Sequence, residues 1–421
     1  MFSLPFIFKS PICLNILLYF YNNETEKFNK ALSGINYSNI AEDLNYDNTE
    51  KLYGNTLRTS ISKLEEYRRC AFSYYLKYGL KLKENDEFKV KSLDTGSFMH
   101  EVIDSFFEYL EVKNIDIKNI ETEDIKKIVE ELINNIFSSN RFYIFTSSKK
   151  YIVLSKKLKR VVLEAIEYIV YTLKNSDFKI LGHEIEFDNK SKYKPIVLET
   201  DNGKKIEIIG KIDRVDVGKL DNKQYVRIID YKSSIKNIDL NQVVAGLQIQ
   251  LITYLDAISE QENFIESGIL YMPLIENIVK SENNLTEEEI KEKIRKNFKM
   301  QGMILADISV VKMMDNKLES GYSDIIPAYI NKDGNLSESN NTLKIEEFKL
   351  IQNKVKGVIK EIAKEILKGK IDIKPYNYKN KTGCDYCNFK SICRFNTSIK
   401  GNEYSYIKNV DKKLALELIK K

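Results

Sequence analysis

Apolar residues recur at helical spacing in several long segments of the chain. A stripe through Phe98, Ile103 and Leu110 predicts a helix that begins near Gly96, and residues 345–367 carry an equally regular stripe. We expect the apolar face of the second helix to pack into the core. The same spacing predicts helices over three further segments: 121–175, 240–258 and 282–299.

A shorter helical pattern precedes these segments. Hydroxyl residues followed by a carboxylate in Ser60–Glu65 are typical of a capped helix start. The run from Tyr67 to Tyr78 continues the pattern and predicts that Cys70 lies on a helix that ends near Gly79.

The middle of the chain changes to the alternating pattern of strands. Turn residues such as Gly203 and Asp221-Asn222 separate the runs. Because these strands are bracketed by helices, we expect an α/β fold with a central mixed sheet flanked by helices. The predicted strands are 180–187, 193–198, 206–217, 224–231 and 267–271.

Composition is that of a soluble globular protein with a sizeable core. The chain has 421 residues, a net charge of only +5 and five cysteines. A net charge this small does not by itself indicate a nucleic-acid partner. The apolar stretch Met1–Tyr21 is interrupted by Lys9, Pro11 and Asn15, and is too short to span a bilayer, so we expect a buried strand or helix and no membrane partner. Cysteines without a secretory signal favour a reducing, cytoplasmic location.

Four of the cysteines form a pattern typical of a metal site. Cys384, Cys387 and Cys393 lie close together near the end of the chain, and Cys70 lies far upstream. A tight trio with one distant thiol is a poor disulfide pattern, but thiolates at this spacing bind zinc or an iron–sulfur cluster. Ordinary buried thiols and a zinc site both remain open from spacing alone. Cys13 has no comparable partner nearby.

A second candidate site lies in the strand region. Asp230 and Lys232 share one face of an extended strand while Tyr231 points to the other, and a hairpin would bring Asp213 beside Asp230. Carboxylates that converge in this way suit Mg²⁺ or Mn²⁺, and a lysine beside them can orient or activate water. The alternative is a solvent-exposed, salt-bridged hairpin.

Two other features accompany these acids. Gln250 and Tyr254 are four residues apart and share one helix face. His100 opens the helix that begins after Gly96, although an isolated histidine is more often structural than a ligand. His183 is expected to be structural.

These motifs, taken in order, resemble a known family. The set resembles RecB-type nucleases of the PD-(D/E)XK superfamily, and the cysteines resemble the iron–sulfur staple of its AddB and CRISPR-associated exonuclease branches. Shorter strings resemble the nuclease end of AddB proteins over about residues 50–400. The strings are Leu52-Tyr53-Gly54, Ser60–Tyr67, Tyr78–Leu82 and Gly246–Leu251, and the motifs are Gly96-x-x-x-His100, Gly210-x-x-Asp213, Asp230-Tyr231-Lys232 and Gln250-x-x-x-Tyr254.

The resemblance implies a Mg²⁺-dependent DNA exonuclease with a restriction-endonuclease-like core. Asp213, Asp230, the Tyr231 carbonyl and His100 would hold Mg²⁺ or Mn²⁺, and Lys232 would position water or stabilise charge. Gln250 and Tyr254 would orient Lys232 or the DNA backbone, and Glu184 could support the site. Cys70, Cys384, Cys387 and Cys393 would bind a [4Fe–4S] cluster. Ala71 stands where the family usually has proline after the first cysteine.

The resemblance also implies a domain layout and partners. Residues 1–50 would be an N-terminal remnant, 51–400 the nuclease domain with a helical insert at about 112–178, and 401–421 a C-terminal tail. The partners would be DNA and an AddA-type helicase–nuclease chain, in double-strand break repair by homologous recombination. We expect a form shortened at its N-terminus, and we find no phosphate-loop motif for ATP. A catalytically silent DNA-binding scaffold and a standalone CRISPR-type exonuclease are the alternatives.

Overall fold

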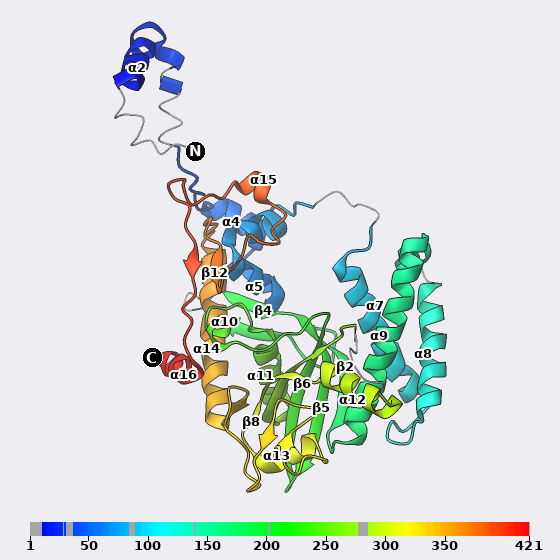
Figure 1. Ribbon diagram of the computed structural model, residues 1–421. Helices are drawn as coiled ribbons and strands as arrows, with labels where there is room; N and C mark the ends of the chain where they lie inside the picture. Colours follow the sequence, from blue (N-terminus) through cyan, green and yellow to red (C-terminus); the bar gives the residue numbers. More distant parts are fainter. Residues whose placement is uncertain are drawn as a thin grey trace.

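A six-stranded mixed sheet lies at the centre of the molecule (Figure 1). The computed structural model describes residues 11–27, 29–30, 37–83, 89–138, 140–200, 203–276 and 285–420. The order of the strands is β11-β8-β7-β6-β5-β2, with β6–β7 and β8–β11 parallel and the other pairs antiparallel. The strands are β2 (Lys179–Phe187), β5 (Gly210–Leu220), β6 (Lys223–Lys232), β7 (Ile265–Pro273), β8 (Gln301–Leu305) and β11 (Thr342–Leu343).

Helices cover the sheet on both sides, which confirms the expected α/β architecture. Figure 1 shows α11 and α14 on one side and α7, α8 and α9 on the other. The apolar face of α14 is buried, as its stripe predicted. The longer helices are α7 (Ser92–Val112), α8 (Thr122–Phe137), α9 (Lys149–Lys174), α11 (Gln250–Glu262), α12 (Glu287–Phe298) and α14 (Ile345–Leu367). Residues 282–284 of the helix predicted over 282–299 lie outside the described residues.

Shorter elements complete the fold. Two three-stranded sheets, β1-β4-β3 and β13-β12-β14, and the β9–β10 pair lie outside the central sheet. Their strands are β1 (Thr56–Thr59), β3 (Ile196–Glu199), β4 (Lys205–Ile208), β9 (Gly321–Tyr322), β10 (Tyr329–Ile330), β12 (Tyr376–Tyr378), β13 (Lys381–Thr382) and β14 (Ser405–Tyr406). The shorter helices are α2 (Pro11–Asn23), α4 (Tyr46–Tyr53), α5 (Ile61–Arg69), α6 (Ala71–Tyr74), the π-helix η1 (Tyr75–Gly79), the 3₁₀-helix η2 (Asn140–Thr146), α10 (Leu240–Val244), α13 (Ile308–Met314), α15 (Lys390–Cys393) and α16 (Lys412–Lys420).

The expectation that Cys70 lies within a helix is wrong. Helix α5 ends at Arg69, and Cys70 itself is extended, with φ −170° and ψ 118°. Its N–H donates to Glu66 O of the preceding helix, and its carbonyl accepts from Tyr74 N of the next. Cys70 therefore caps two short helices at a bend, and its thiol is buried there. The prediction that the helical run ends at Gly79 is confirmed.

Two other elements predicted as continuous are divided. The 206–217 strand breaks at Ile209, whose N–H bonds to Thr59 O, so β4 joins the β1 sheet while β5 joins the central sheet. The 240–258 helix breaks at Gly246, which has φ +82°. The predicted 193–198 strand begins only at Ile196. At Ile209 and Gly246 a tertiary contact overrides the local pattern.

The N-terminal apolar stretch is helical over Pro11–Asn23 but is not buried where its side chains are described. Ile16, Leu18 and Tyr19 are exposed by about half or more. The expectation of a buried element is therefore wrong for these residues, and residues 1–10 lie outside the described part of the chain. Within the described residues, no helix is both long and apolar enough to cross a membrane.

The segment predicted as a helical insert, 112–178, contains α8, η2 and α9. Its helices agree with the apolar spacing of residues 121–175. Its status as an insert stays a prediction, as do the domain boundaries.

Candidate metal centre

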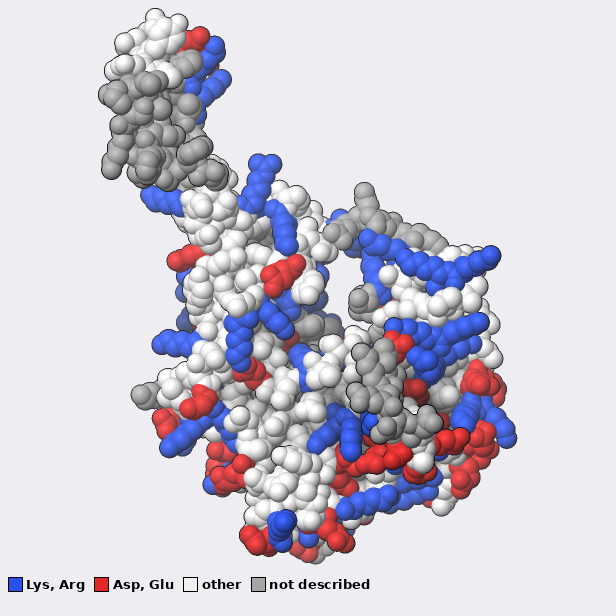
Figure 2. All heavy atoms as spheres, in the orientation of Figure 1, with Lys and Arg blue, Asp and Glu red and all other residues white. Residues whose placement is uncertain are grey.

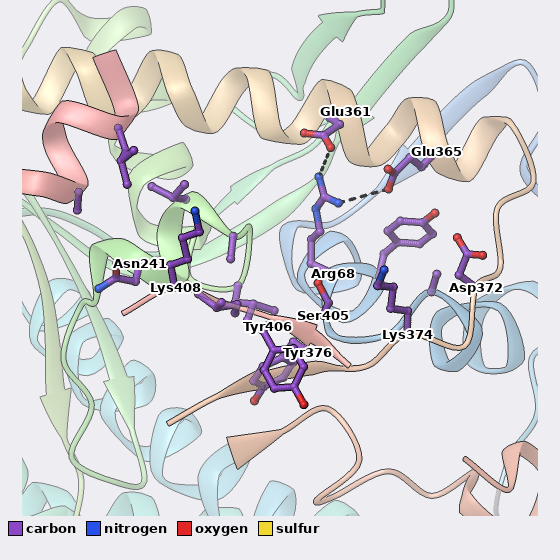
Figure 3. A pocket seen from close by; sticks show the side chains of 18 of the residues that line it. Arg68, Asn241, Glu361, Glu365, Asp372, Lys374, Tyr376, Ser405, Tyr406 and Lys408 are labelled. Carbon is purple, nitrogen blue, oxygen red and sulfur yellow. Dashed lines mark hydrogen bonds and ion pairs between the residues drawn. The ribbon is translucent and has the colours of Figure 1, made fainter. Parts of the chain in front are cut away.

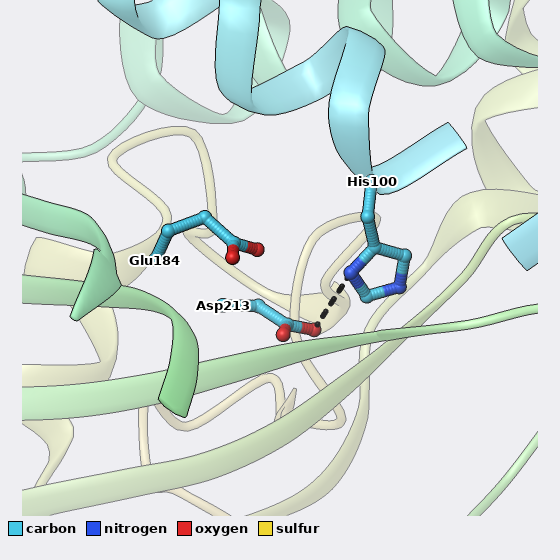
Figure 4. Close-up of side chains that lie close together, drawn as sticks. All are labelled: His100, Glu184 and Asp213. Carbon is cyan, nitrogen blue, oxygen red and sulfur yellow. Dashed lines mark ion pairs between the residues drawn. The ribbon is translucent and has the colours of Figure 1, made fainter. Parts of the chain in front are cut away.

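Three side chains from three elements converge at one end of the sheet. His100 comes from α7, Glu184 from β2 and Asp213 from β5 (Figure 4). One ligand atom from each lies within 4.8 Å of the other two, and within the described residues this is the one trio of histidine, cysteine and acidic side chains that does so. All three side chains are partly buried. An imidazole and two carboxylates so close together are a plausible ligand set for a divalent cation.

The hairpin predicted from the sequence sets the position of Asp213. Strands β5 and β6 are antiparallel, with Arg214 paired to Ile229, which places Asp213 next to the Asp230–Tyr231 end of β6. The Asp213 carboxylate accepts a 2.8 Å hydrogen bond from Tyr231 N. The sequence prediction that these motifs meet is therefore confirmed.

His100 contacts both strands of the hairpin. Its Nδ1 lies 3.6 Å from Asp213 Oδ2, and its Nε2 lies 3.1 Å from the Tyr231 carbonyl oxygen. The imidazole thus bridges two groups that the sequence resemblance named as metal ligands. The helix that carries it begins earlier than expected, at Ser92, because Lys91 N donates to Asp94 in a capping box.

The electrostatics of the pocket favour a bound cation. Burial, and then the negative charge of Asp230, raise the pKa of Asp213 to about 6, although His100 and Tyr231 N act in the opposite direction. A buried carboxylate beside a second negative charge is stabilised when a cation neutralises it. The residues of this pocket are therefore suited to bind a hard divalent cation.

Cationic side chains lie beside the carboxylates. Lys232 Nζ pairs with Asp230, which is only 4% exposed, as the alternation along β6 predicted. Lys211 Nζ pairs with Glu184. The alternative of a solvent-exposed hairpin is wrong, because Asp230 and Tyr231 are buried.

A cavity of about 620 Å³ opens in front of these groups. His100, Asp213, Glu184 and Lys232 line it, and so does Arg141 from η2, which pairs with Glu101 of α7. Lys211, Arg141 and Glu101 were not predicted as site residues. Nothing in the periodicity of their segments marks them, because Arg141 reaches the pocket only where η2 lies against α7, and Lys211 only where β5 pairs with β2.

Glu184 was only a weak candidate from sequence, and the structure gives it a central place. It follows a bulge in β2 and has φ +49°, a conformation that is uncommon for a residue with a side chain. Backbone strain of this kind concentrates at functional sites. Its neighbour His183 pairs with Asp104 of α7, so that β2 is fastened to the helix that carries His100.

Tyr254 lies behind the pocket instead of lining it. It is 3% exposed, and its ring stacks on Phe187 at 5.5 Å. A Cβ atom at Gly210 would stand only 1.9 Å from the Tyr254 hydroxyl oxygen, so the tyrosine fills the notch left by that glycine at the start of β5. Tyr254 therefore supports the strand that carries Asp213. For Gln250, the contact found is that of its backbone N–H with Glu65, and its side-chain role stays a prediction.

The four cysteines of the predicted cluster site lie near the C-terminal end of α5. Cys70 is buried, Cys384, Cys387 and Cys393 are partly exposed, and none of the four forms a disulfide. Burial, together with the neighbouring Cys393 and Cys384, raises the pKa of Cys70 to about 12, although hydrogen bonds from the Ser73 and Phe72 backbones act in the opposite direction. Thiols that repel one another as thiolates, with N–H donors beside them, form a suitable environment for a bound metal or cluster.

One family model matches most of the chain. The model described as the PD-(D/E)XK nuclease superfamily covers residues 58–394. This span contains His100, Glu184, Asp213 and all four clustered cysteines.

Curated relatives are similar over nearly the whole chain. A protein from Clostridium novyi, named as one subunit of an ATP-dependent helicase/deoxyribonuclease, is 40% identical over 420 residues, which are 98% of this chain and 37% of the relative. Proteins of the same name from Clostridium acetobutylicum and Acetivibrio thermocellus are each 37% identical, over 94% and 88% of this chain and 35% and 33% of their own lengths. The chain therefore spans about a third of the length of these relatives.

Proposed function

Since the chain belongs to the PD-(D/E)XK nuclease superfamily, we propose that it is a metal-dependent deoxyribonuclease, acting as the exonuclease part of an AddAB-type helicase–nuclease. Membership confirms the fold class and the resemblance drawn from the sequence motifs. The observation that carries the proposal is the convergence of His100, Glu184 and Asp213 beside the Asp230–Lys232 pair.

His100, Glu184 and Asp213 would hold Mg²⁺ or Mn²⁺, together with Asp230 and the Tyr231 carbonyl. The bound ion would polarise the scissile phosphate and lower the pKa of a water molecule. The contact of His100 with both Asp213 and Tyr231 orients its ring toward these oxygens. The raised pKa of Asp213 supports a cation at this position.

The chain's own cations would act on the substrate. Lys232 is held at the pocket wall by Asp230, where its ammonium group can position water or stabilise the charge that develops on the phosphate. Lys211 and Arg141 are each paired with a carboxylate, Glu184 and Glu101. With a metal ion held by Glu184, Lys211 would be free to contact a phosphate of the DNA backbone.

The shape of the surface supports a nucleic-acid substrate. Figure 2 shows the visible face hollowed between the part of the molecule that contains α4 and α5 and the α7–α9 helices, with lysine and arginine side chains on both sides of the hollow. The whole chain carries only +5, so this arrangement of charge is local. Phosphates of DNA bind such basic borders.

We propose that Cys70, Cys384, Cys387 and Cys393 hold a [4Fe–4S] cluster. Their spacing, a tight C-terminal trio with one distant thiol, supports this proposal, because each thiolate of such a cluster binds a separate iron. Such a cluster would join the α5 arm to the C-terminal segment. Reduced thiols of this kind fit a cytoplasmic location.

The names of the relatives support a partner chain. Each relative is named as one subunit of an ATP-dependent helicase/deoxyribonuclease, which implies at least one other subunit and a DNA substrate for those proteins. We propose an AddA-type chain as the partner of this protein, and double-strand break repair by homologous recombination as the setting.

A digestion assay tests the proposal. Purified, anaerobically handled protein is incubated with end-labelled linear DNA in Mg²⁺, in Mn²⁺ and in EDTA. We expect stepwise shortening from an end in either metal and no cleavage in EDTA. Binding of the DNA without any cleavage in either metal would favour the catalytically silent scaffold instead.

A further inference from the structure

Glu65 of α5 connects the cysteine-bearing arm to the helix behind the metal centre. We propose that Glu65 is a positioning residue: it holds the N-terminus of α11, and through Tyr254 it sets the start of the strand that carries Asp213. The inference rests on the proposed nuclease function for its effect on activity. The contacts themselves stand independently of it.

The first link is a pair of hydrogen bonds across the interior. The Glu65 carboxylate accepts from Ile249 N at 2.9 Å and from Gln250 N at 3.2 Å, and both bonds end on Oε1. These are two of the N–H groups that the first turn of a helix leaves without partners. Helix α11 has no side-chain cap from its own residues, so the carboxylate of Glu65, from another helix, caps its N-terminus. When ionised, the carboxylate also suits the positive end of the helix dipole.

The second link fixes α5 itself in place. Gly246, at the bend before α11, has φ +82°, and a Cβ there would come within 2.8 Å of Arg68 Cγ, so the bend packs directly on α5. Arg68 in turn pairs with Glu361 and Glu365 of α14 (Figure 3). Helix α5 is thus clamped between α14 and the α10–α11 bend.

The third link leads from α5 to the cysteines. Cys70 directly follows α5 and bonds to Glu66 O within it. Gly383, next to Cys384, packs so closely on the end of α5 that a Cβ would stand 2.5 Å from Arg69 O. The cysteine-bearing segments therefore pack directly on the end of the helix that carries Glu65.

The last link leads from α11 to the metal centre. Tyr254, one turn beyond Gln250, places its hydroxyl in the notch at Gly210, three residues before Asp213 on β5. Because the start of β5 has so little free space there, a shift of α11 along its axis moves the strand. Misplacement by about 1 Å can cost roughly a hundredfold in rate, so a loosened cap should reduce catalysis.

Water is a poor substitute for the Glu65 carboxylate as the acceptor of these two hydrogen bonds. Burial raises its pKa to about 7, with Lys236 and the two backbone N–H groups acting to lower it. Removal of the carboxylate would leave two N–H donors without partners in a desolvated place. A glutamine at this position keeps an oxygen that can accept both bonds, because both end on the same atom of the glutamate.

The experiment compares Glu65→Ala, Glu65→Gln and the control Glu130→Ala, which removes an exposed glutamate from α8. Each full-length variant is assayed for kcat and KM, for iron per chain, and for amide hydrogen exchange by mass spectrometry. If Glu65→Ala yields no folded protein, Glu65→Met, which keeps the side-chain length without an acceptor, takes its place.

For Glu65→Ala we expect kcat to fall by at least about tenfold, with iron content and KM close to those of the wild type. Exchange should rise in the first turn of α11 and in residues 210–213. Glu65→Gln should restore kcat to within about threefold of the wild type, and Glu130→Ala should change nothing.

Three results would overturn the proposal. They are unchanged kcat and exchange in Glu65→Ala, loss of iron together with activity in that variant, and a Glu65→Gln protein as impaired as Glu65→Ala. If the wild type itself does not cleave DNA, the proposed function fails, and the exchange data alone decide whether Glu65 positions α11 and β5.

Discussion

His100 Nδ1 lies 3.6 Å from Asp213 Oδ2, although one residue belongs to a helix and the other to a strand of a different part of the chain. The pair is completed by Glu184, from a third element, and by the backbone of Tyr231. This convergence makes the end of the β5–β6 hairpin a candidate metal centre and supports the nuclease function proposed for the chain.

Lys232 should be needed for chemistry but not for metal binding. Its ammonium group pairs with Asp230 and lines the pocket, yet it cannot itself be a ligand of a cation. We expect Lys232→Ala to reduce cleavage by about a hundredfold or more, while Mn²⁺ affinity measured by calorimetry stays within about threefold of the wild type. A variant that no longer binds Mn²⁺ would show that the lysine organises the carboxylates instead.

Metal affinity should fall in mild acid. In the metal-free protein, burial and the charge of Asp230 raise the pKa of Asp213 to about 6 from an ordinary value of 3.8. Below that pH the carboxyl group is protonated and must lose its proton before it can bind metal, so affinity should decrease as the pH falls through about 6 and level off above about 7. Calorimetry of Mn²⁺ binding across this range, in buffers of different ionisation enthalpy, should also detect proton release near pH 6. Constant affinity down to about pH 5 would contradict the assignment of Asp213.

Substitution by alanine at two glycines should change the stability of the protein in opposite directions. Gly210 has the Tyr254 hydroxyl 1.9 Å from its would-be Cβ, whereas Gly357 on the exposed side of α14 has no atom within 4 Å. We expect Gly210→Ala to lower the free energy of unfolding by about 1–3 kcal/mol through overpacking. Gly357→Ala should raise it by about 0.5–1 kcal/mol through helix propensity. The denaturant midpoints of the two variants test these expectations. A Gly210→Ala protein as stable as the wild type would contradict the tight packing of Tyr254 against Gly210.

Iron should depend on Cys70 and not on Cys13. Anaerobically purified protein should be brown and contain about four irons per chain. Cys70→Ala should lose the iron and become less stable, because the proposed cluster would connect the end of α5 to the C-terminal cysteines through that thiol. Cys13→Ala serves as the matched control. A colourless protein with one tightly bound zinc would overturn the cluster and leave the nuclease proposal intact, and equal iron loss in both variants would mean that the fourth ligand is wrong.

Local patterns predicted the central elements well. The α14 helix was predictable because its apolar period is unbroken, and the strand that carries Asp230 was predicted nearly in full as residues 224–231. Cys70 and Gly246 show the limit. At both positions the chain bends to meet a partner distant in sequence, and helical periodicity continues across the bend, so the pattern alone cannot locate it.

The sequence singled out the motif residues that the structure brings together, but not their surroundings. Strand alternation and the expected hairpin made Asp213, Asp230 and Lys232 candidates, and the resemblance gave His100 a place among the expected ligands. Glu184 depends on a bulge and a positive φ that leave no mark on the alternation of β2. Arg141 reaches the pocket only because η2 folds back over α7, which is a tertiary relationship.

The most direct test replaces one carboxylate and measures two properties. Asp213→Asn removes a negative ligand from the centre while leaving Lys211, Arg141 and the basic border unchanged. The account predicts that this variant binds linear DNA within about threefold of the wild-type affinity at matched salt, and that its Mg²⁺-dependent cleavage falls by at least about a thousandfold. Asp116→Asn, an exposed surface position, is the control and should cleave normally. Undiminished cleavage by Asp213→Asn in Mg²⁺ would contradict the metal centre described here.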